Sequence, residues 1–472
     1  MITITNLILF AILLILYYNV PQKWQKHLLF AANILFAVLM GIDTLVALLA
    51  VSIVVFCGVR AMSKRENKKP WMAGLVTVIV LILVSVKYLG FLCGLAGIDL
   101  SMSVVRPVQA IGISFYSLRL ISYIVDVYRG QEAEEDFEDL FCFVSFFPIL
   151  TAGPIERSEH LMTQLTCYKP FVEQKVYRGF ITALYGLFLK QVIADRLGVL
   201  VDEVYSDIGS YSGALCLIIV VFYSFQIYAD FAGYSYIAIG MSRMLGIDIM
   251  QNFERPYLAV SIRDFWRRWH ISLSRWLRDY IYIPLGGNKK GRLRKSINIL
   301  ITFLISGLWH GAGLNFIVWG GLHGIYQVAE DITDSSAGKN KDDSLTGRIL
   351  RIVITFMLVT VAWVFFRADS VTQAFMMFAK IIDGPGFKSL ADGAIFELGL
   401  GRLQVIGILV SLVIMIVIDI LQERKVITID RFAASGRIIR WALSYAAILW
   451  IITAAIQLYG ITEEATFIYA AF

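Results

Sequence analysis

The sequence predicts an all-α polytopic membrane protein. Of its 472 residues, 58% are hydrophobic and only 17% are charged, a balance that soluble domains do not show. Apolar runs of about 18 to 25 residues recur along the chain, and each can cross the hydrocarbon core as a helix. We expect about 11 transmembrane helices in a single domain over residues 1–472, because no polar stretch is long enough to build a soluble domain.

The N-terminal part predicts four crossings. Residues 3–20 lack a basic n-region and a small-residue cleavage site, so we expect a retained span and not a signal peptide. Residues 28–59 are too long for one helix and predict a pair that turns near residues 41–43. The basic loop 60–69 precedes a span over residues 71–95. Basic loops mark the cytoplasmic side, which places the N-terminus outside.

The middle of the chain is less regular. Residues 104–128 are apolar, and residues 139–153 run into Pro154, which predicts a broken, re-entrant segment. Such backbone must be buried in protein or line a wet cavity. Residues 154–176 are polar and are expected at the surface. Residues 177–196 and 213–248 predict three more helices.

One of these helices carries polar residues on one face. Gln226 and Asp230 are four residues apart, and Gly233 and Gly240 permit close helix contact. Asp230 is either a packing or capping group or a residue that lines a cavity. Further along, residues 349–367, 404–421 and 438–459 predict three spans, and the weakly charged loop 384–402 is expected at the outer face.

Between these regions lies a polar block, residues 263–323, which holds three of the five histidines: His270, His310 and His323. A polar block inside a membrane protein is costly and therefore marks a candidate functional site. The spacings of 40 and 13 residues between these histidines match no standard zinc site, so no metal is expected. The net charge of +6 fits basic cytoplasmic loops, and no nucleic-acid partner is expected. The five cysteines contain no CxxC pair.

Residues 263–280 predict one amphipathic helix. Aromatic and apolar side chains share one face: Phe265, Trp266, Trp269, Leu273, Trp276, Leu277 and Tyr280. The other face is basic, with Arg267, Arg268, Arg275 and Arg278. This helix either anchors the chain at the membrane interface, with His270 incidental, or holds the phosphates of a ligand. The charge pattern alone does not separate the two uses.

Residues 297–323 are apolar apart from a few polar side chains, and we treat them as one continuous helix. His310 stands beside Trp309, Gly311 and Gly313, which would allow close helix approach and access for a small molecule. A histidine in such a span is often a packing residue. Imidazole is also the commonest general acid–base group, which makes His310 the candidate catalytic residue.

The motifs RDFWRRWHISLSRWLRDYIYIPLGGN and SGLWHGAGLNFIVWGGLHG resemble the membrane-bound O-acyltransferase family, and most closely its bacterial alginate O-acetylase branch. The D-alanyl transfer proteins of teichoic acid synthesis are a more distant resemblance. The similarity covers roughly residues 105–370. It implies a ring of helices around a tunnel, in which an acyl group that enters from the cytoplasm meets a hydroxyl acceptor.

The resemblance also implies roles for residues. The essential histidine of the family corresponds to His310 and a second family position to His270, while His323 matches a further histidine of the alginate-type branch. Arg119 stands where that branch often has Gln, and Tyr236 where it often has Asp. These departures indicate that the acceptor or the partner differs from alginate systems.

We therefore expect a multi-pass enzyme of the cytoplasmic membrane. It would move an acetyl group from acetyl-CoA to an extracytoplasmic polysaccharide, or to an SGNH-like acetyltransferase partner outside, and would hold no tightly bound cofactor. His310 would be the general base, and His270, Trp or Asn side chains would stabilise the oxyanion. The residues expected to bind substrate are Arg267, Arg268, Arg275, Arg278, Trp309, His323, Asp230 and Asn315.

Two alternatives remain open at this point. In the first, the protein transfers a D-alanyl or another acyl group to a cell-envelope glycan. In a different class, it would be a proton-coupled transporter or flippase in which the buried histidines and Asp230 relay protons. The transporter alternative predicts inverted repeats, and the sequence contains no internal repeat.

Overall fold

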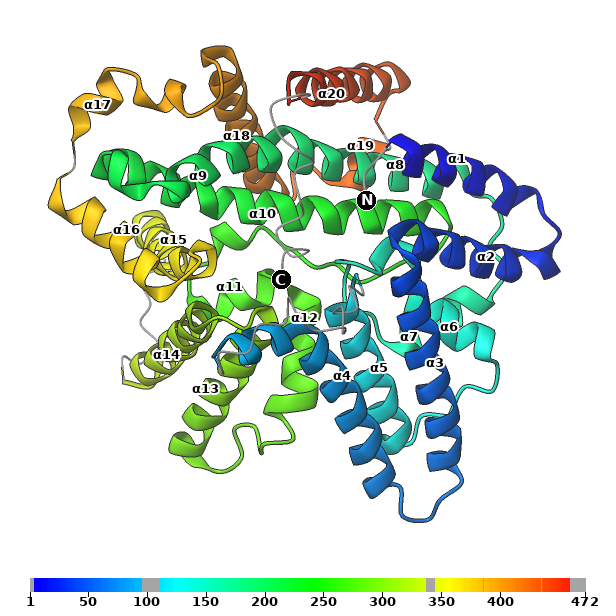
Figure 1. The fold of residues 1–472 in the computed structure, drawn as a ribbon. Coiled ribbons are helices and arrows are strands. Elements are labelled where there is room, and N and C mark those ends of the chain that lie inside the picture. Colours follow the sequence, from blue (N-terminus) through cyan, green and yellow to red (C-terminus); the bar gives the residue numbers. More distant parts are fainter. Residues whose placement is uncertain (1–3, 96–110, 337–343, 385, 434, 459–472) are drawn as a thin grey trace. The chain divides into compact units, whose positions relative to one another are not determined.

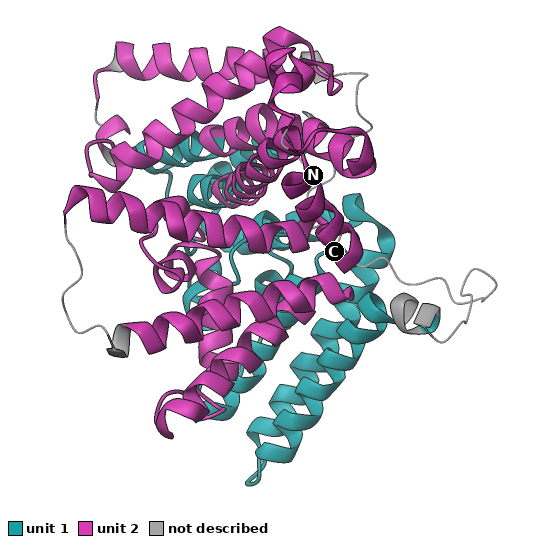
Figure 2. Ribbon diagram, turned by 90° about the vertical axis from the view of Figure 1, so that its left-hand side faces the viewer, with its two compact units in different colours: residues 1–183, 237–251 teal, residues 184–236, 252–472 magenta. Residues whose placement is uncertain are grey.

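A computed structural model describes residues 4–95, 111–336, 344–384, 386–433 and 435–458, and every regular element in these residues is a helix (Figure 1). The predicted all-α class is therefore confirmed. The described chain divides into two compact units (Figure 2). Unit 1 comprises residues 1–183 and 237–251, and unit 2 comprises residues 184–236 and 252–472.

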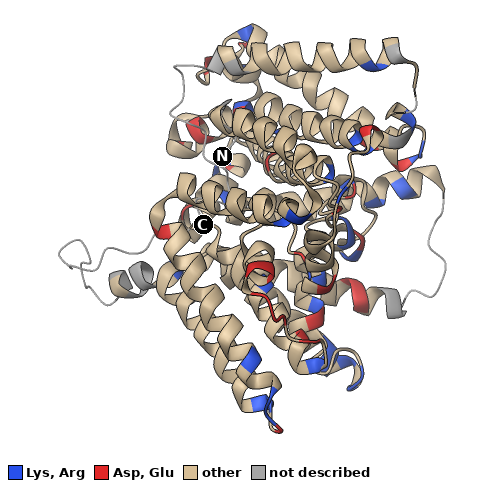
Figure 3. Cartoon of the chain, turned by 90° about the vertical axis from the view of Figure 1, so that its right-hand side faces the viewer, with Lys and Arg blue, Asp and Glu red and all other residues tan. Residues whose placement is uncertain are grey.

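Unit 1 begins with four long helices: α1 (Ile4–Asn19), α2 (Gln22–Met40), α3 (Ile42–Ser63) and α4 (Lys69–Leu95). Helices α2 and α3 meet at Gly41, whose φ of 129° lies in a region that favours glycine. The turn predicted near residues 41–43 is thus confirmed. Lysine and arginine gather at the turn between α3 and α4, while the bodies of these helices are almost free of charge (Figure 3).

The rest of unit 1 contains the broken segment. After α5 (Ile113–Arg129), helix α6 (Phe137–Ser145) ends and a short 3-10 turn, Phe147–Ile149, follows. The fully buried Arg119 of α5 donates hydrogen bonds to the carbonyl oxygens of Phe143, at 3.1 Å, and Ile149, at 3.4 Å. It thereby pairs carbonyls that the helix break leaves without intrahelical partners. Residues 104–110 of the predicted segment 104–128 lie outside the described residues.

Residues 154–156 are buried. The prediction that residues 154–176 lie at the surface is therefore wrong for these three residues. Glu156 is fully buried and accepts hydrogen bonds from the backbone N–H of Met250 and from His160 Nδ1, the latter at 2.8 Å. A buried carboxylate needs such partners. The short helix α7 (Ser158–Thr166), which carries His160, follows directly.

Unit 2 contains a buried ion pair, Lys190 with Asp230. Helix α8 (Glu173–Leu187) begins in unit 1 and leads into a π-helical turn, Phe188–Ala194, and then into α9 (Asp195–Ser206). The 32-residue α10 (Gly213–Met244) follows, and its residues 237–244 belong to unit 1. A Cβ on Gly233 of α10 would lie 2.8 Å from the carbonyl oxygen of Gly186. The close helix contact predicted for this glycine is confirmed.

The remaining helices of unit 2 follow in chain order: α11 (Ile262–Arg268), α12 (Ile271–Leu277), α13 (Gly291–His310), α14 (Leu314–Ser336), α15 (Leu345–Arg367), α16 (Val371–Asp383), α17 (Phe387–Ala391), α18 (Arg402–Glu423), α19 (Ile429–Ala433) and α20 (Arg437–Leu458). Within the described residues, five helices are long and apolar enough to span a membrane: Ile42–Ser63, Lys69–Tyr88, Gly213–Met244, Leu345–Arg367 and Arg402–Glu423. The total of about 11 spans and the central tunnel stay predictions.

Candidate functional site

The segment that contains the first histidine of the site is not one helix, so the prediction of a single helix over residues 263–280 is wrong. Helix α11 ends at Arg268, and α12 begins only after His270, whose backbone is left-handed with φ of 43°. The break is stabilised by Asn252. Its carbonyl oxygen accepts from the N–H of Ile271 at 3.0 Å, and its Oδ1 accepts from the N–H of Ser272 at 3.2 Å. The first N–H groups of α12 are thus paired with Asn252, outside the helix.

Asn252 also determines which ring nitrogen of neutral His270 carries the hydrogen. Because Oδ1 of Asn252 accepts from the backbone N–H of Ser272 and from its hydroxyl at 2.9 Å, this atom is the amide oxygen. His270 Nδ1 lies 3.2 Å from the same oxygen and must therefore carry a hydrogen. In the neutral ring the lone pair then lies on Nε2. In this tautomer, neutral His270 presents an acceptor nitrogen at Nε2. The expectation that His270, Trp or Asn side chains stabilise the oxyanion stays a prediction.

The second part of the polar block is a helical hairpin. The predicted continuous helix over residues 297–323 is wrong, because α13 ends at His310 and α14 begins at Leu314. The two helices pack closely at Gly307 and Gly320. A Cβ on Gly307 would overlap the carbonyl oxygen of Phe316, and one on Gly320 would overlap that of Phe303. His310 therefore lies at the tip of the hairpin, and His323 lies on its returning arm.

Aromatic rings bring the three histidines into one cluster. The exposed fraction is 0% for His270, 3% for His310 and 0% for His323. The Trp309 ring lies 6.2 Å from that of His270 and 4.8 Å from that of His310, measured between ring centroids. The Trp319 ring lies 4.9 Å from that of His310 and 5.1 Å from that of His323. His270 and His323, which are 53 positions apart in the chain, thus belong to one cluster through the rings of Trp309 and Trp319.

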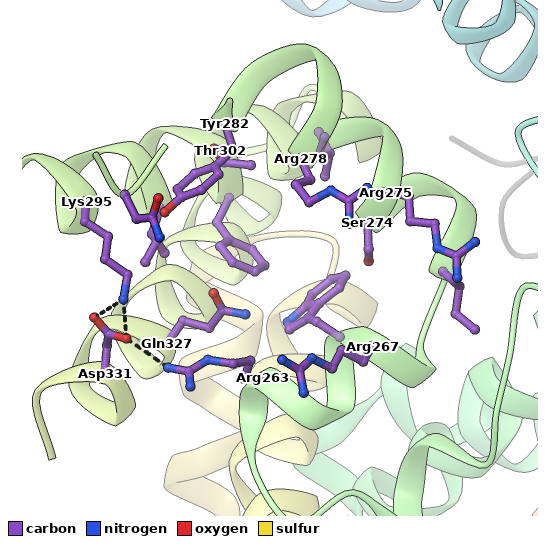
Figure 4. Close-up of a pocket in the computed structure, with 16 residues that line it drawn as sticks. Arg263, Arg267, Ser274, Arg275, Arg278, Tyr282, Lys295, Thr302, Gln327 and Asp331 are labelled. Atoms are coloured by element: carbon purple, nitrogen blue, oxygen red, sulfur yellow. Dashed lines mark hydrogen bonds and ion pairs between the residues drawn. The ribbon is translucent and has the colours of Figure 1, made fainter. Parts of the chain in front are cut away.

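A basic cavity of about 670 Å³ lies next to this cluster. Figure 4 shows the side chains that line the cavity. Five cationic side chains line it: Arg263, Arg267, Arg275, Arg278 and Lys295. One acidic residue, Asp331, also lines the cavity, and it accepts from Lys295 Nζ at 2.5 Å and from Arg263 at 2.9 Å. The cationic excess suits an anionic ligand, and arginine pairs well with phosphate or carboxylate groups.

Two residues connect the cavity to the histidines. Trp266 and Phe303 line the cavity, and both rings contact His323, at 5.1 and 6.2 Å between centroids. The Trp266 indole N–H also donates a hydrogen bond to His323 Nδ1 at 3.2 Å. The charged cavity and the buried histidines are therefore parts of one site in unit 2.

The structure brings together only some of the predicted binding residues. Arg267, Arg275 and Arg278 line the cavity, and Trp309 lies in the histidine cluster. Arg268 does not line the cavity. It pairs with Asp264 at 3.0 Å and makes two hydrogen bonds to Glu423, at 2.9 and 3.1 Å.

Two other predicted binding residues have structural partners. Asp230 accepts from Lys190 Nζ at 2.6 Å, and Lys190 also pairs with Asp195 at 2.6 Å. Asn315 donates to the carbonyl oxygens of Phe365 at 3.3 Å and Ala368 at 2.8 Å, at the C-terminal end of α15. These contacts favour a packing role for Asp230 and Asn315.

Sequence reasoning missed several residues of the site. Arg263 and Lys295 line the cavity, but neither was among the predicted binding residues. Asn252 had no assigned role, and its only signal was its place in the motif NFERPYLAV, 18 residues before His270. No local pattern indicates which polar side chain will face a distant histidine.

Comparison with known proteins identifies the family of this chain. Residues 131–368 match the membrane-bound O-acyltransferase family, and this range includes all three histidines. The chain is 36% identical over 435 residues to a probable alginate O-acetylase of Azotobacter vinelandii, which covers 89% of this chain and 85% of that protein. It is 38% identical over 294 residues to a peptidoglycan O-acetyltransferase of Helicobacter pylori, covering 56% and 55%.

A more distant relative has a different printed activity. A teichoic acid D-alanyltransferase of Bacillus subtilis is 29% identical over 264 residues, covering 53% of this chain and 67% of that protein. The family match spans half of the sequence, and the similarity to the alginate O-acetylase spans most of it. This chain belongs to the membrane-bound O-acyltransferase family.

Proposed function

We propose that the protein transfers an acetyl group from a cytoplasmic thioester, acetyl-CoA, to hydroxyl groups of an extracytoplasmic polysaccharide. The observation that carries this proposal is the basic cavity beside the buried histidine cluster, joined to it by Trp266 and Phe303. Acyl transfer needs a place for the charged carrier and a sheltered place for the reaction. The two parts of the site meet these needs.

The cavity supports a carrier that bears phosphate groups. Its volume of about 670 Å³ lies within the range of small-molecule and cofactor sites. Arg267, Arg275 and Arg278 present guanidinium groups that can pair with a diphosphate, and none of the three is buried. The acyl end of the carrier would then point past Trp266 toward the histidines.

The proposed reaction uses His310 as general base. His310 takes the proton of the acceptor hydroxyl while the hydroxyl oxygen attacks the thioester carbonyl carbon. A C–O bond forms and the carbonyl oxygen becomes an oxyanion. When this intermediate collapses, the C–S bond breaks and the thiolate leaves with the proton from His310. With its lone pair on Nε2, neutral His270 fits a second proton acceptor in the same cluster.

The acceptor is proposed from the relatives. Their printed names include an alginate O-acetylase and a peptidoglycan O-acetyltransferase, so an envelope or secreted glycan is the expected acceptor class. Transfer would be direct or would pass through an SGNH-like acetyltransferase partner outside the membrane. D-alanyl transfer is the second candidate, because one relative is a teichoic acid D-alanyltransferase.

Reconstituted vesicles test the proposal. Radiolabelled acetyl-CoA is supplied on the face equivalent to the cytoplasm, with candidate glycans and partners on the other face. We expect His310→Ala to lower acetyl transfer by about 10²-fold or more. The control is His27→Ala, which changes an exposed histidine of unit 1 that pairs with Glu138. Equal transfer by wild type and a folded His310→Ala protein would contradict the catalytic assignment.

A matched pair of variants tests the cavity. Arg267→Gln and Arg275→Gln should each raise KM for acetyl-CoA about 10-fold, because charge-assisted hydrogen bonds contribute roughly 1.5–3 kcal/mol. Arg294→Gln is the control, since Arg294 is exposed near Lys295 and does not line the cavity. If all three variants keep the wild-type KM, the carrier binds elsewhere.

A further inference from the structure

His323 is the one histidine of the cluster that the proposed reaction does not use. It is fully buried on α14, and the rings of Phe265, Trp266, Phe303, Trp319, Tyr326 and Trp363 surround it. These aromatic side chains bring it close to both the cavity and His310. Its hydrogen bonds therefore decide what chemistry it can contribute.

Trp266 fixes the tautomer of His323. An indole N–H can only donate a hydrogen bond, so His323 Nδ1, 3.2 Å away, must accept it with its lone pair. The hydrogen of the neutral ring is then on Nε2. A second hydrogen on Nδ1 would break this bond and place a charge in an apolar surrounding. His323 is thus a neutral donor with no basic nitrogen free.

The Nε2–H group has no hydrogen-bond partner among the residues that the structure describes. A buried donor without a partner is uncommon and destabilises the folded state. Nε2 points in a different direction from Nδ1, which faces Trp266. A group that arrives with the substrate can supply the missing acceptor.

We propose that His323 donates its Nε2–H to the carbonyl oxygen of the acyl thioester and that Trp266 is the positioning residue that holds it in this form. This inference rests on the proposed function, and it adds the electrophilic side of the reaction. As the acceptor oxygen attacks, charge develops on the carbonyl oxygen and the hydrogen bond from Nε2–H strengthens. His323 keeps its hydrogen throughout, while the acceptor proton moves to His310 and then to the leaving thiolate.

The hydrogen bonds give His270 and His323 opposite roles. Asn252 oxygen makes His270 carry its hydrogen on Nδ1, whereas the Trp266 N–H makes His323 carry it on Nε2. One neutral ring accepts a proton and the other donates a hydrogen bond. Opposite tautomers thus place an acceptor nitrogen and a donor N–H in one cluster before any proton moves.

Nitrogen-15 NMR of the histidine-labelled protein in lipid bilayers tests the tautomer without an activity assay. The chain has only five histidines, so the His323→Gln variant identifies the His323 signals by difference. We expect an unprotonated Nδ1 and a protonated Nε2 between pH 6 and pH 8 in the wild type. In Trp266→Phe, which keeps a ring but loses the donor, we expect a mixture of tautomers. A protonated Nδ1 in the wild type would overturn the proposal.

Two substitutions of His323 test its contribution to acetyl transfer. His323→Phe removes the donor and should lower kcat by about 10²–10³-fold. His323→Gln keeps a neutral N–H donor that cannot titrate, and it should stay within about 10-fold of the wild type. If the Gln variant is as inactive as the Phe variant while both are folded, donation is not the role of His323. If the wild type itself transfers no acetyl group, the proposed function fails, and the NMR result still decides the tautomer.

Discussion

At the scale of single residues, function in this site depends on which atom of a neighbour faces each imidazole. His270 and His323 are both fully buried, yet one faces an amide oxygen and the other an indole N–H. The identity of these neighbours sets the chemistry of each ring. Asn252 and Trp266 are therefore as informative for the mechanism as the histidines.

Asn252 provides the first prediction. The variant Asn252→Ala removes the side-chain oxygen of Asn252. The ring Nδ1–H of His270 and the backbone N–H and hydroxyl of Ser272 then lose their common acceptor. Each lost partner costs about 1–3 kcal/mol, so the break before α12 should loosen and the melting temperature should fall. We expect kcat to fall at least ~10-fold while KM for acetyl-CoA changes little, since Asn252 does not line the cavity.

Ser235→Ala is the control for Asn252. It removes only the hydroxyl that accepts from Asn252 Nδ2 at 3.3 Å and leaves the contact with His270 in place. Its kcat should stay near the wild-type value. Equal losses in both variants would mean that packing around Asn252, and not the hydrogen bond to His270, sustains activity.

Residue types predicted part of the site, and long-range contacts determined the rest. Arg267, Arg275 and Arg278 were predicted because they share a basic face, and they line the cavity. Arg268 belongs to the same run, but its partner Glu423 is 155 residues away in the chain. No periodicity in residues 263–280 predicts that Glu423, at the end of α18, will pair with Arg268.

At the scale of elements, the errors of prediction fall at helix breaks. The periodicity of residues 263–280 predicted the correct buried face, since Phe265, Trp266 and Trp269 are all buried. It did not predict the break at His270. The N–H groups of Ile271 and Ser272 pair there with Asn252, which approaches them only in the folded chain. Residues 311–313, which form the turn of the hairpin, were likewise interpreted as giving access to a small molecule.

The packing of the hairpin predicts that alanine substitutions at the adjacent Gly320 and Gly321 have opposite effects on stability. In Gly320→Ala, the new Cβ would overlap the carbonyl oxygen of Phe303, so α13 and α14 must separate. Overpacking typically costs about 1–3 kcal/mol, and here it would also displace His310 relative to His323. We expect a lower melting temperature and a marked loss of acetyl transfer.

The neighbouring Gly321→Ala supplies the control for Gly320. Its Cβ would lie 3.8 Å from the nearest atom, a side-chain carbon of Leu304. Alanine also favours the helical state over glycine by roughly 0.8–1.0 kcal/mol. This variant should be as stable as the wild type or slightly more stable. Equal destabilisation by the two variants would contradict the close packing of α13 on α14.

Helix α7 in unit 1 predicts a pH dependence. The hydrogen bond from His160 to the buried Glu156, together with the negative charge of Glu156, raises the pKa of His160 against the opposing effect of burial. The folded state therefore binds the proton more tightly than the unfolded state, where histidine titrates near pH 6.5. The stabilisation is fully present below about pH 6.5 and is lost as the pH rises through the raised pKa.

A pair of variants measures this dependence. His160→Gln should lower the melting temperature more at pH 5.5 than at pH 8.5, because only the protonated ring forms the charged pair. Glu159→Gln, an exposed change on the same helix, should show no such difference. A His160→Gln effect that is larger at pH 8.5 would mean that the pair stabilises the fold through the neutral ring.

At the scale of the whole molecule, composition predicted the class, and the motifs predicted the family. Apolar runs predicted helices that the structure confirms, such as α15 and α18, to within a few residues at each end. Burial of polar residues could not be predicted in the same way, because Glu156 and Lys190 are polar by type and buried only through partners distant in the chain. Such partners are set by tertiary packing.

The last prediction concerns the orientation of unit 2 in the membrane. Helices α15 and α18 have 23 and 22 residues, or about 35 Å each, enough to cross a hydrocarbon core of about 30 Å. Arg348 near the start of α15 and Glu423 at the end of α18 approach to 3.7 Å, so these two ends lie at the same level. The described residues 386–401 between the helices then lie at the opposite end. The positive-inside rule assigns the basic residues 289–295, at the turn before α13 and in its first turn, to the cytoplasm.

Cysteine labelling checks this orientation in a variant whose five native cysteines are replaced. Lys388→Cys introduces one exposed thiol in residues 386–401, and Lys290→Cys introduces one at the turn before α13. In right-side-out membrane vesicles, a membrane-impermeant maleimide should label Lys388→Cys at once and Lys290→Cys only after permeabilisation. Inverted vesicles should give the reverse order. Prompt labelling of Lys290→Cys in right-side-out vesicles would place the basic cavity on the outer face, where cytoplasmic acetyl-CoA cannot reach it.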